Sequence, residues 1–383
     1  MQLEILTDNE LCTSICEDYW LQDEDGKFAL KVQEIAVKHE MKAHIVSQYV
    51  KQHAYIWSAS ICCRRCEEPY RFSTRIQYQE RNRYAGSICQ ECSESARKNI
   101  VDQKRNILIQ FRQAAVNSKP DLATLDLRST IYLLAIIHAL SNEDLSAIEP
   151  LNDYPDYTLS PDPVFDRCIL RHLIDKHLLL INLDSSPEAV MLNVDDTATI
   201  NFVMSTFDFA LDQQEISKFI HDFLDTEVLH NIKHSPEFIE LCKEIQLQEC
   251  LAFLKVKLEE HQFDFSPGEK TQHTLMQCLE SFSVAQIYNF IWRAARDAAA
   301  YYMRSNVSKK QAANTVVRSI SRSLEQALAY DWDVKAFSRN YDLPQSSLSH
   351  IIFNILLGTG DGGFKQPLHE LLQETDTQQD HEQ

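Results

Sequence analysis

Apolar residues recur three or four positions apart over much of this chain, which is the spacing of one face of an α-helix. Stretch 216–228 is the clearest case, with apolar residues at 216, 219, 220, 223 and 228. Stretch 129–140 is apolar around its whole circumference, which predicts a helix buried at the centre of a domain. Only 7 of the 383 residues are glycine and 11 are proline, too few for a turn-rich β-protein. We therefore expect a mainly α, multidomain chain.

The middle of the chain predicts a helical unit closed by two strands. A short helix over 142–148 and an amphipathic helix over 164–177 follow the buried one. Two apolar runs within 178–194 flank a turn at 184–187, which is typical of a β-hairpin. Helix, helix, helix and hairpin over about residues 127–196 resemble a winged-helix domain. Because its surroundings are acidic, the resemblance implies protein docking or dimerisation rather than DNA contact.

Four of the eleven cysteines form two closely spaced pairs, Cys63-x2-Cys66 and Cys89-x2-Cys92. Two thiolates on each tight turn supply four soft ligands for a tetrahedral ion, so this spacing predicts one structural Zn²⁺. Cys62 is an alternative ligand to Cys63, and a set of buried or redox-paired thiols is the alternative to metal binding. The six remaining cysteines are scattered as reduced thiols are, and no disulfide framework is expected.

Arginine and aromatic residues alternate between the two cysteine pairs, an arrangement that suits a small metal-stapled hairpin with one packed and one cationic face. The segment looks like a zinc ribbon. Arginine binds phosphate as a planar fork, and the predicted helix after Cys92 carries further cations on its outer side. The candidates for phosphate contact are Arg71, Arg75, Arg97 and Lys98.

The net charge of −19 is unevenly distributed along the chain. Residues 1–26 carry −8, residues 27–112 carry +8, residues 113–292 carry −18, residues 293–339 carry +5 and residues 340–383 carry −6. Binding to phosphate requires local positive potential rather than a basic average. The two basic blocks are therefore the places to expect nucleic-acid contacts, and the alternative is that they are solvated faces.

The first basic block contains a helix, a short turn and a second helix over 27–52. Ala36 places a small residue where the two helices approach, Met41 packs at the turn, and Val46 and Val50 belong to the buried face of the second helix. This stretch resembles the helix-turn-helix of bacterial regulators, with Glu40 at the turn position where glycine is usual; an ordinary helical hairpin is the alternative. The resemblance implies contact with double-stranded DNA through Lys42, His44, Ser47, Gln48 and Lys51.

The second basic block predicts a pair of helices and leads into the sequence FSRNYDLPQSSLSHIIFNIL at 337–356. Its register again resembles a helix-turn-helix, with Pro344 suited to the first turn of the second helix. A plain helical pair would show the same pattern. If the resemblance holds, the residues facing the DNA groove are Gln345, Ser346, Ser347 and His350.

One further group of residues offers metal ligands in principle: His221, Asp222, Asp225, His230 and His234. No second His/Asp cluster with matching spacing accompanies it, and such residues commonly coat an exposed helix face. The sequence shows no phosphate-cradling glycine loop, nucleophile elbow or paired-carboxylate motif. We therefore expect no enzyme, with a metal-dependent hydrolase at the His221 region as an alternative.

These patterns predict four regions: a helix-turn-helix and zinc-ribbon domain at 1–120, a winged-helix-like domain at 121–200, a C-terminal helical domain at 201–372, and a disordered acidic tail at 373–383. No apolar run is long enough to span a bilayer and the N-terminus is acidic, so we expect a cytoplasmic protein without membrane contact.

The expected function is that of a zinc-containing DNA-binding protein, either a sequence-recognising regulator or a targeting subunit of a bacterial complex. A protein partner or a homodimer is expected at the acidic middle. The alternative is an interaction scaffold or inhibitor, in which that middle docks a basic partner or mimics nucleic acid.

Overall fold

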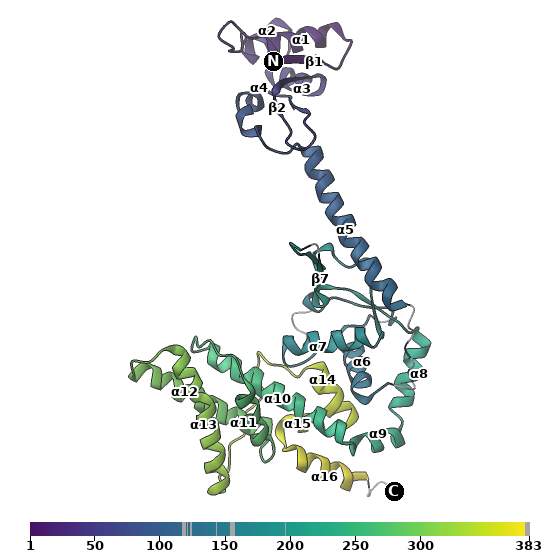
Figure 1. Ribbon diagram of the computed structural model, residues 1–383, viewed down its shortest axis with the longest axis vertical. Coiled ribbons are helices and arrows are strands. Elements are labelled where there is room, and N and C mark those ends of the chain that lie inside the picture. Colours follow the sequence, from purple (N-terminus) through teal and green to yellow (C-terminus); the bar gives the residue numbers. More distant parts are fainter. Residues whose placement is uncertain are drawn as a thin grey trace. The chain divides into compact units, whose positions relative to one another are not determined.

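The computed structural model describes residues 1–116, 120, 122, 125–142, 144–153, 158–195 and 197–379 (Figure 1). About 60% of the chain is helical and 9% is strand, which confirms the expectation of a mainly α protein. The chain divides into two compact units, Met1–Gln103 and Lys104–Gln383, and the division falls within the long helix α5 (Gln90–Val116). None of the helices in the described residues combines the length and apolar character needed to cross a bilayer.

Unit 1 combines short helices with a three-stranded antiparallel sheet. Its elements before α5 are β1 (Gln2–Ile5), α1 (Glu10–Trp20), α2 (Val32–Lys38), α3 (Ala43–His53), β2 (Ala54–Cys62), β3 (Pro69–Phe72), α4 (Arg75–Gln79) and η1 (Arg81–Tyr84). The strand order is β1-β2-β3. Its core joins Ile15 and Trp20 of α1 to Ile35, Val46 and Ile56, all of which are buried. This core holds α3 in place with its opposite face outward.

The first half of unit 2 is built around α6 (Leu127–Leu140). All six residues from Ile131 to Ile136 are buried, so the expectation of a helix enclosed on all sides is confirmed for this part. The elements that follow α6 are β4 (Ala147–Ile148), η3 (Leu151–Asp153), α7 (Pro163–Asp175), β5 (Leu179–Ile181), η4 (Pro187–Ala189), β6 (Val190–Leu192), β7 (Ala198–Ile200), η5 (Phe202–Met204), β8 (Phe207–Phe209), α8 (Gln213–Phe223) and α9 (Thr226–Lys233).

The strand pairing differs from the expected hairpin. The two apolar runs are strands, but β5 pairs with β8 in a sheet of order β4-β8-β5, whereas β6 pairs with β7 in a separate two-stranded sheet. β8 lies between β4 and β5 and pairs with both, and its Phe207 and Phe209 are buried on one face, so this later strand rather than β6 is the partner of β5. The prediction of a hairpin between the two runs is therefore wrong.

Two predicted helices in this half also change. Stretch 142–148 forms a turn and β4 rather than a helix, because the Asn142 side chain accepts hydrogen bonds from the backbone N–H groups of Ser146 and Ala147. Glu143 lies outside the described residues. The amphipathic stretch 216–228 is split into α8 and α9, because Asp225 caps the second helix by accepting a bond from Glu227 N–H.

The second half of unit 2 is helical. Its elements are α10 (Pro236–Glu259), α11 (Glu269–Leu279), α12 (Val284–Arg304), α13 (Lys309–Ala329), α14 (Ser347–Ser349), the π-helix η6 (His350–Leu356), α15 (Gly362–Lys365) and α16 (Leu368–Gln379). α12 and α13 lie side by side (Figure 1). The helix α10 joins the two halves, because its first turns enter the core around α6 and its later turns enter the core of α11–α13.

The second predicted helix-turn-helix is wrong. Residues 332–340 form no helix, and Phe337 instead donates its N–H to the Ala285 carbonyl at 2.9 Å. Of the residues expected to face a DNA groove, Ser346 is 1% exposed and caps α14, and Ser347 is also buried. Gln345 donates to Asn354 at 3.0 Å, and the half-buried His350 stacks on His138. These polar side chains are used inside the fold.

The C-terminal helix α16 runs to Gln379 and so enters the 373–383 segment that the composition predicts to be disordered. Residues 380–383 lie outside the described residues.

Candidate metal centre and adjoining basic surface

The two cysteine pairs meet in unit 1. One ligand atom from each of Cys63, Cys66, Cys89 and Cys92 lies within 4.8 Å of the others, which confirms that these four residues form one cluster able to hold a metal ion. Cys62 lies outside it, and its thiol donates to the Ala59 carbonyl at 3.3 Å. A tetrahedral ion with bonds of 2.3 Å to sulfur separates its ligands by about 3.8 Å. The Cys66 and Cys89 sulfurs are 3.8 Å apart and so fit such an ion.

Each pair sits in a tight turn fixed by the backbone. The first pair links β2 to β3, where Cys63 donates its N–H to the Glu68 carbonyl at 2.9 Å and Glu67 adopts a left-handed φ of 61°. The second pair follows Gly86, whose φ of 77° favours glycine, and lies at the start of α5. Arg64 N–H donates to the Ser87 carbonyl at 3.0 Å and so ties the two turns together.

Backbone donors favour a thiolate at this cluster. The N–H groups of Cys89 and Arg65 lie 3.2 Å and 3.3 Å from the Cys63 sulfur, and backbone hydrogen bonds of this kind lower the pKa of Cys63 to about 6. A hydrogen bond with the Cys89 thiol raises the pKa of Cys92 to about 12. A bound metal would favour the deprotonated form of every ligand.

One face of helix α3 is polar and lies on the surface of unit 1. Val46 and Val50 are fully buried, and the opposite residues Lys42, His44, Gln48 and Lys51 are exposed. Ser47, the fifth predicted contact, is half-buried and its hydroxyl lies 3.5 Å from the Ala43 carbonyl. Glu40, at the turn before α3, has a left-handed φ of 54°, the backbone conformation for which glycine is usual. The sequence contains no acidic residue in α3.

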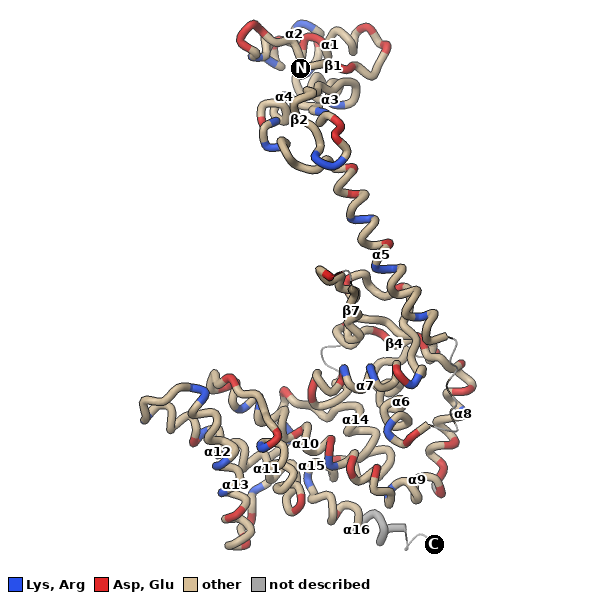
Figure 2. The backbone as a smooth tube through the Cα atoms, viewed as in Figure 1, with Lys and Arg blue, Asp and Glu red and all other residues tan. Residues whose placement is uncertain are grey.

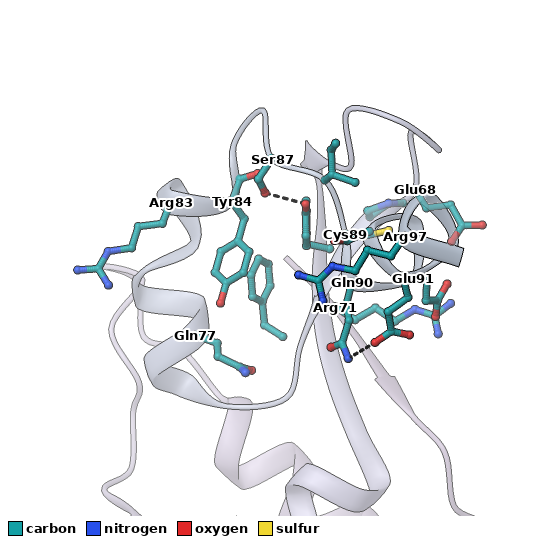
Figure 3. A pocket seen from close by; sticks show the side chains of 16 residues that line it. Glu68, Arg71, Gln77, Arg83, Tyr84, Ser87, Cys89, Gln90, Glu91 and Arg97 are labelled. Atoms are coloured by element: carbon teal, nitrogen blue, oxygen red, sulfur yellow. Dashed lines mark hydrogen bonds between the residues drawn. The ribbon is translucent and has the colours of Figure 1, made fainter. Parts of the chain in front are cut away.

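A hollow of about 980 Å³ adjoins the cysteine cluster (Figure 3). Cys89 lines it together with three arginines, of which Arg71 and Arg97 are predicted phosphate contacts and Arg83 is not. Figure 3 shows Arg83 projecting outward on one side and Arg97 beside Gln90 on the other. The carboxylates that line the hollow are Glu68, Glu91 and Glu94.

The arginines around this hollow are held differently. The Arg71 guanidinium lies 4.9 Å from the Tyr55 ring centre, and Arg83 forms an exposed ion pair with Glu80 at 2.9 Å. Within the described part of the chain, neither Arg71 nor Arg97 forms an ion pair, and Lys98 is exposed on α5. The sequence does not predict Arg83 as a lining residue, because nothing but its position in the arginine-rich segment distinguishes it from the neighbouring arginines.

Arg75 does not face outward as predicted. Its Nε donates to the Tyr19 carbonyl and one terminal nitrogen donates to the Leu30 carbonyl, both at 2.7 Å. The guanidinium also lies 4.3 Å and 4.4 Å from the ring centres of Tyr19 and Phe28. Burial lowers the pKa of Arg75 below its ordinary value. The prediction of a phosphate contact is wrong, because these contacts use the guanidinium to join α1 to the following loop and α4.

We expect Arg75→Ala to destabilise unit 1 by about 2–3 kcal/mol, since it removes charge-assisted hydrogen bonds to two partly buried carbonyls. Urea unfolding followed by Trp20 and Trp57 fluorescence, with Trp292 and Trp332 replaced by Phe, would measure the loss. Arg71→Ala is the matched control, with an expected change within about 0.5 kcal/mol. Equal stability of the two variants would contradict this role for Arg75.

The second potential metal site does not assemble. Among the described residues, only the four cysteines bring three or more potential ligands together. The rings of His230 in α9 and His234, its C-cap, meet edge to face with centres 4.9 Å apart, but they do not form such a group with His221, Asp222 or Asp225. The His and Asp residues of the hydrolase alternative are therefore not brought together as metal ligands among the described residues.

No protein-family model matches this chain, and neither the curated proteins nor the solved structures contain a significant match to it. Function is therefore inferred from the chain's own residues.

Proposed function

We propose that this protein is a zinc-containing protein that binds double-stranded DNA through unit 1 and recognises its sequence with α3. The observation that carries the proposal is the exposed face of α3, where His44, Gln48 and Lys51 stand out from a helix anchored by buried valines. A regulator or a targeting subunit of a bacterial complex is the biological role that fits this activity. The protein partner or homodimer expected at the acidic middle remains a prediction.

The side chains on α3 suit base readout. Glutamine forms paired hydrogen bonds with adenine in the major groove, and lysine and histidine donate to base or phosphate acceptors. The helix has the length and the opposite-face packing expected of a helix that enters the groove, with α2 across the left-handed turn at Glu40. An α3 free of carboxylates avoids repulsion by phosphates.

The cations around the metal cluster suit the DNA backbone. Arg71, Arg97 and Lys98 belong to β3 and α5, whose positions depend on the two cysteine turns. Zn²⁺ bound by the four thiolates would supply a structural crosslink rather than chemistry. The metal is thus proposed to fix the positions of these three cations, while α3 recognises the bases.

Two classes of substitution test this proposal on a duplex selected from a randomised pool. Gln48→Ala and His44→Ala should each cost roughly 1–3 kcal/mol of binding and relax preference at one or two base pairs. Arg71→Ala and Arg97→Ala should weaken binding to all duplexes alike and lower the salt slope by about one unit, because phosphates carry no sequence information. Binding would be measured by gel shift at low and moderate salt.

Matched controls separate these effects from general charge loss. Gln33→Ala removes an exposed glutamine from α2, and Arg171→Ala removes an exposed arginine from α7; both should leave duplex affinity unchanged. If none of the four test variants alters duplex affinity at either salt concentration, the proposal fails and the scaffold alternative replaces it.

A further inference from the structure

Two tryptophans lie partly exposed in unit 2. Trp292 of α12 is 39% exposed and Trp332, two residues after the C-cap of α13, is 37% exposed. Tyr330, the C-cap itself, is 72% exposed, and its ring stacks on Trp332 at 6.5 Å with an angle of 20° between the planes. Large aromatic side chains left at a surface are candidates for ligand contact, since their burial would otherwise stabilise the fold.

Arginines accompany both indole rings. The Arg296 guanidinium lies 4.9 Å from the Trp292 ring centre, and that of Arg293 lies 5.7 Å from the Trp332 ring centre. Flat cations next to aromatic faces form the kind of platform on which the bases of a single strand stack. Because a base offers the same π-face in any sequence, such a platform binds single strands with little sequence preference.

The segment that carries Trp332 is held against α12. Asn289 Nδ2 donates to the Lys335 carbonyl at 3.0 Å, and Gln286 Nε2 donates to the Val334 carbonyl at 3.3 Å. A hollow of about 330 Å³ opens there and is lined by Asn289, Phe290, Arg293 and residues 332–335. The ring of Trp332 is thus part of a preformed surface, which lowers the entropy lost on binding.

A row of polar residues on α13 leads to this surface. The last exposed residues at four-residue spacing before the C-cap are Arg318, Arg322 and Gln326, with Tyr330 next in the series. From residue 318 to residue 330 a helix rises about 18 Å. The Lys and Arg positions of α12 and α13 can be followed in blue in Figure 2.

On α13, at the C-terminal half of α12 and beside Trp332, the sequence places few acidic residues, and some of them are paired. Glu325 is the one acidic residue in the sequence of α13, and it lies 3.3 Å from the Ser321 hydroxyl. Asp297 lies 3.5 Å from Arg296. Asp331 and Asp333 flank Trp332, so the platform itself is close to neutral and the positive charge lies along α13. A near-neutral aromatic platform suits uncharged bases, and the positive charge of α13 suits the phosphates.

We infer that unit 2 binds single-stranded nucleic acid, with bases stacked on Trp292, Trp332 and Tyr330 and the phosphate backbone running along the α13 row. The site is separate from the proposed duplex site in unit 1, since each lies within its own compact unit. Single strand is favoured over duplex because stacking requires unpaired bases. A row of about 18 Å next to the aromatic platform is long enough for a few nucleotides, at the lower end of the range of roughly 4–16 nucleotides of known single-strand sites.

The test is fluorescence anisotropy of the full-length protein with a labelled single-stranded DNA of mixed sequence, about 16 nucleotides long. Trp332→Ala and Trp292→Ala should each weaken binding about 5- to 100-fold, whereas Trp332→Phe should retain most of the affinity because it keeps an aromatic face. Arg318→Ala should weaken binding and lower the salt slope by about one unit. Tyr341→Ala, which removes a 96% exposed aromatic ring elsewhere in unit 2, is the matched control and should change nothing.

Thermal unfolding of each variant checks that the fold is intact, and Trp332→Phe and Arg318→Ala keep the test valid if an alanine variant unfolds. Unchanged single-strand affinity in all of the tryptophan and arginine variants would overturn the inference. So would tryptophan-dependent binding of an acidic peptide that competes with the oligonucleotide on equal terms. Gln48→Ala and Arg71→Ala should leave single-strand binding intact, so failure of the duplex proposal is seen separately.

Discussion

Cys89→Ser should unfold much of unit 1 and leave unit 2 folded. The four sulfurs close the turn between β2 and β3 against the start of α5, so a bound ion contributes free energy of folding on the order of 10 kcal/mol, as in small zinc domains. Loss of one thiolate removes most of it. Hydrogen exchange would show rapid exchange in β2, β3 and the start of α5, and metal analysis would show about one Zn²⁺ per chain before the substitution and none after it.

Cys62→Ser is the matched control for this prediction. Its thiol lies outside the cluster, so both zinc content and exchange rates should stay at wild-type values. Removal of the metal by a chelator should reproduce the Cys89→Ser exchange pattern. A wild-type protein purified without metal and with a fully protected β2–β3 turn would contradict the zinc assignment.

Arg339→Ala should destabilise unit 2 by about 3–5 kcal/mol, because it leaves the carboxylate of Glu249 buried without its cation. Glu249 is 4% exposed, and one of its oxygens lies 3.1 Å from the Arg339 guanidinium and 3.0 Å from the Ser349 hydroxyl. The guanidinium also lies 4.3 Å from the Phe364 ring centre. The pair therefore joins α10, the segment after α13, α14 and α15. Urea unfolding followed by circular dichroism would measure the loss.

The pH dependence of this loss identifies its cause. Burial raises the pKa of Glu249 and the charge of Arg339 opposes that rise, so the substitution should raise the folded-state pKa further. A carboxyl group whose pKa is higher in the folded state makes the fold less stable as pH increases past its unfolded value. The deficit should thus be smaller at about pH 5 than at about pH 8.

Lys365→Ala is the matched control for the buried pair. It breaks the ion pair between Lys365 and Asp361 at 3.2 Å, whose side chains are both exposed, and so should change stability by less than about 1 kcal/mol. A deficit for Arg339→Ala that is no larger than this, or that does not vary with pH, would mean that the buried pair does not stabilise unit 2.

The sequence predicts structural features that depend only on residues close together in the chain. Two cysteines three positions apart lie on one turn whatever surrounds them, so the sequence predicts the cluster of two cysteine pairs, although only the structure separates Cys63 from Cys62. The buried α6 and the amphipathic α7 were predicted because periodicity reports directly which face of a helix is apolar. The same holds for α3, whose exposed residues follow once Val46 and Val50 are assigned to the core.

Tertiary contacts decided the features that depend on distant partners. Arg75 resembled the other arginines of its segment, and only the carbonyls of Tyr19 and Leu30, 56 and 45 residues away, distinguish it. The partner of β5 is a strand more than twenty residues further on. The first half of the segment expected to form a second helix-turn-helix is held outside a helix by contacts with α10 and α12, whereas α14 and η6 form in its second half. Local sequence patterns indicate which residues are buried and which secondary structure they favour. A charged side chain or a strand edge, however, can pair with many partners, and the packing of the whole unit decides which partner it meets.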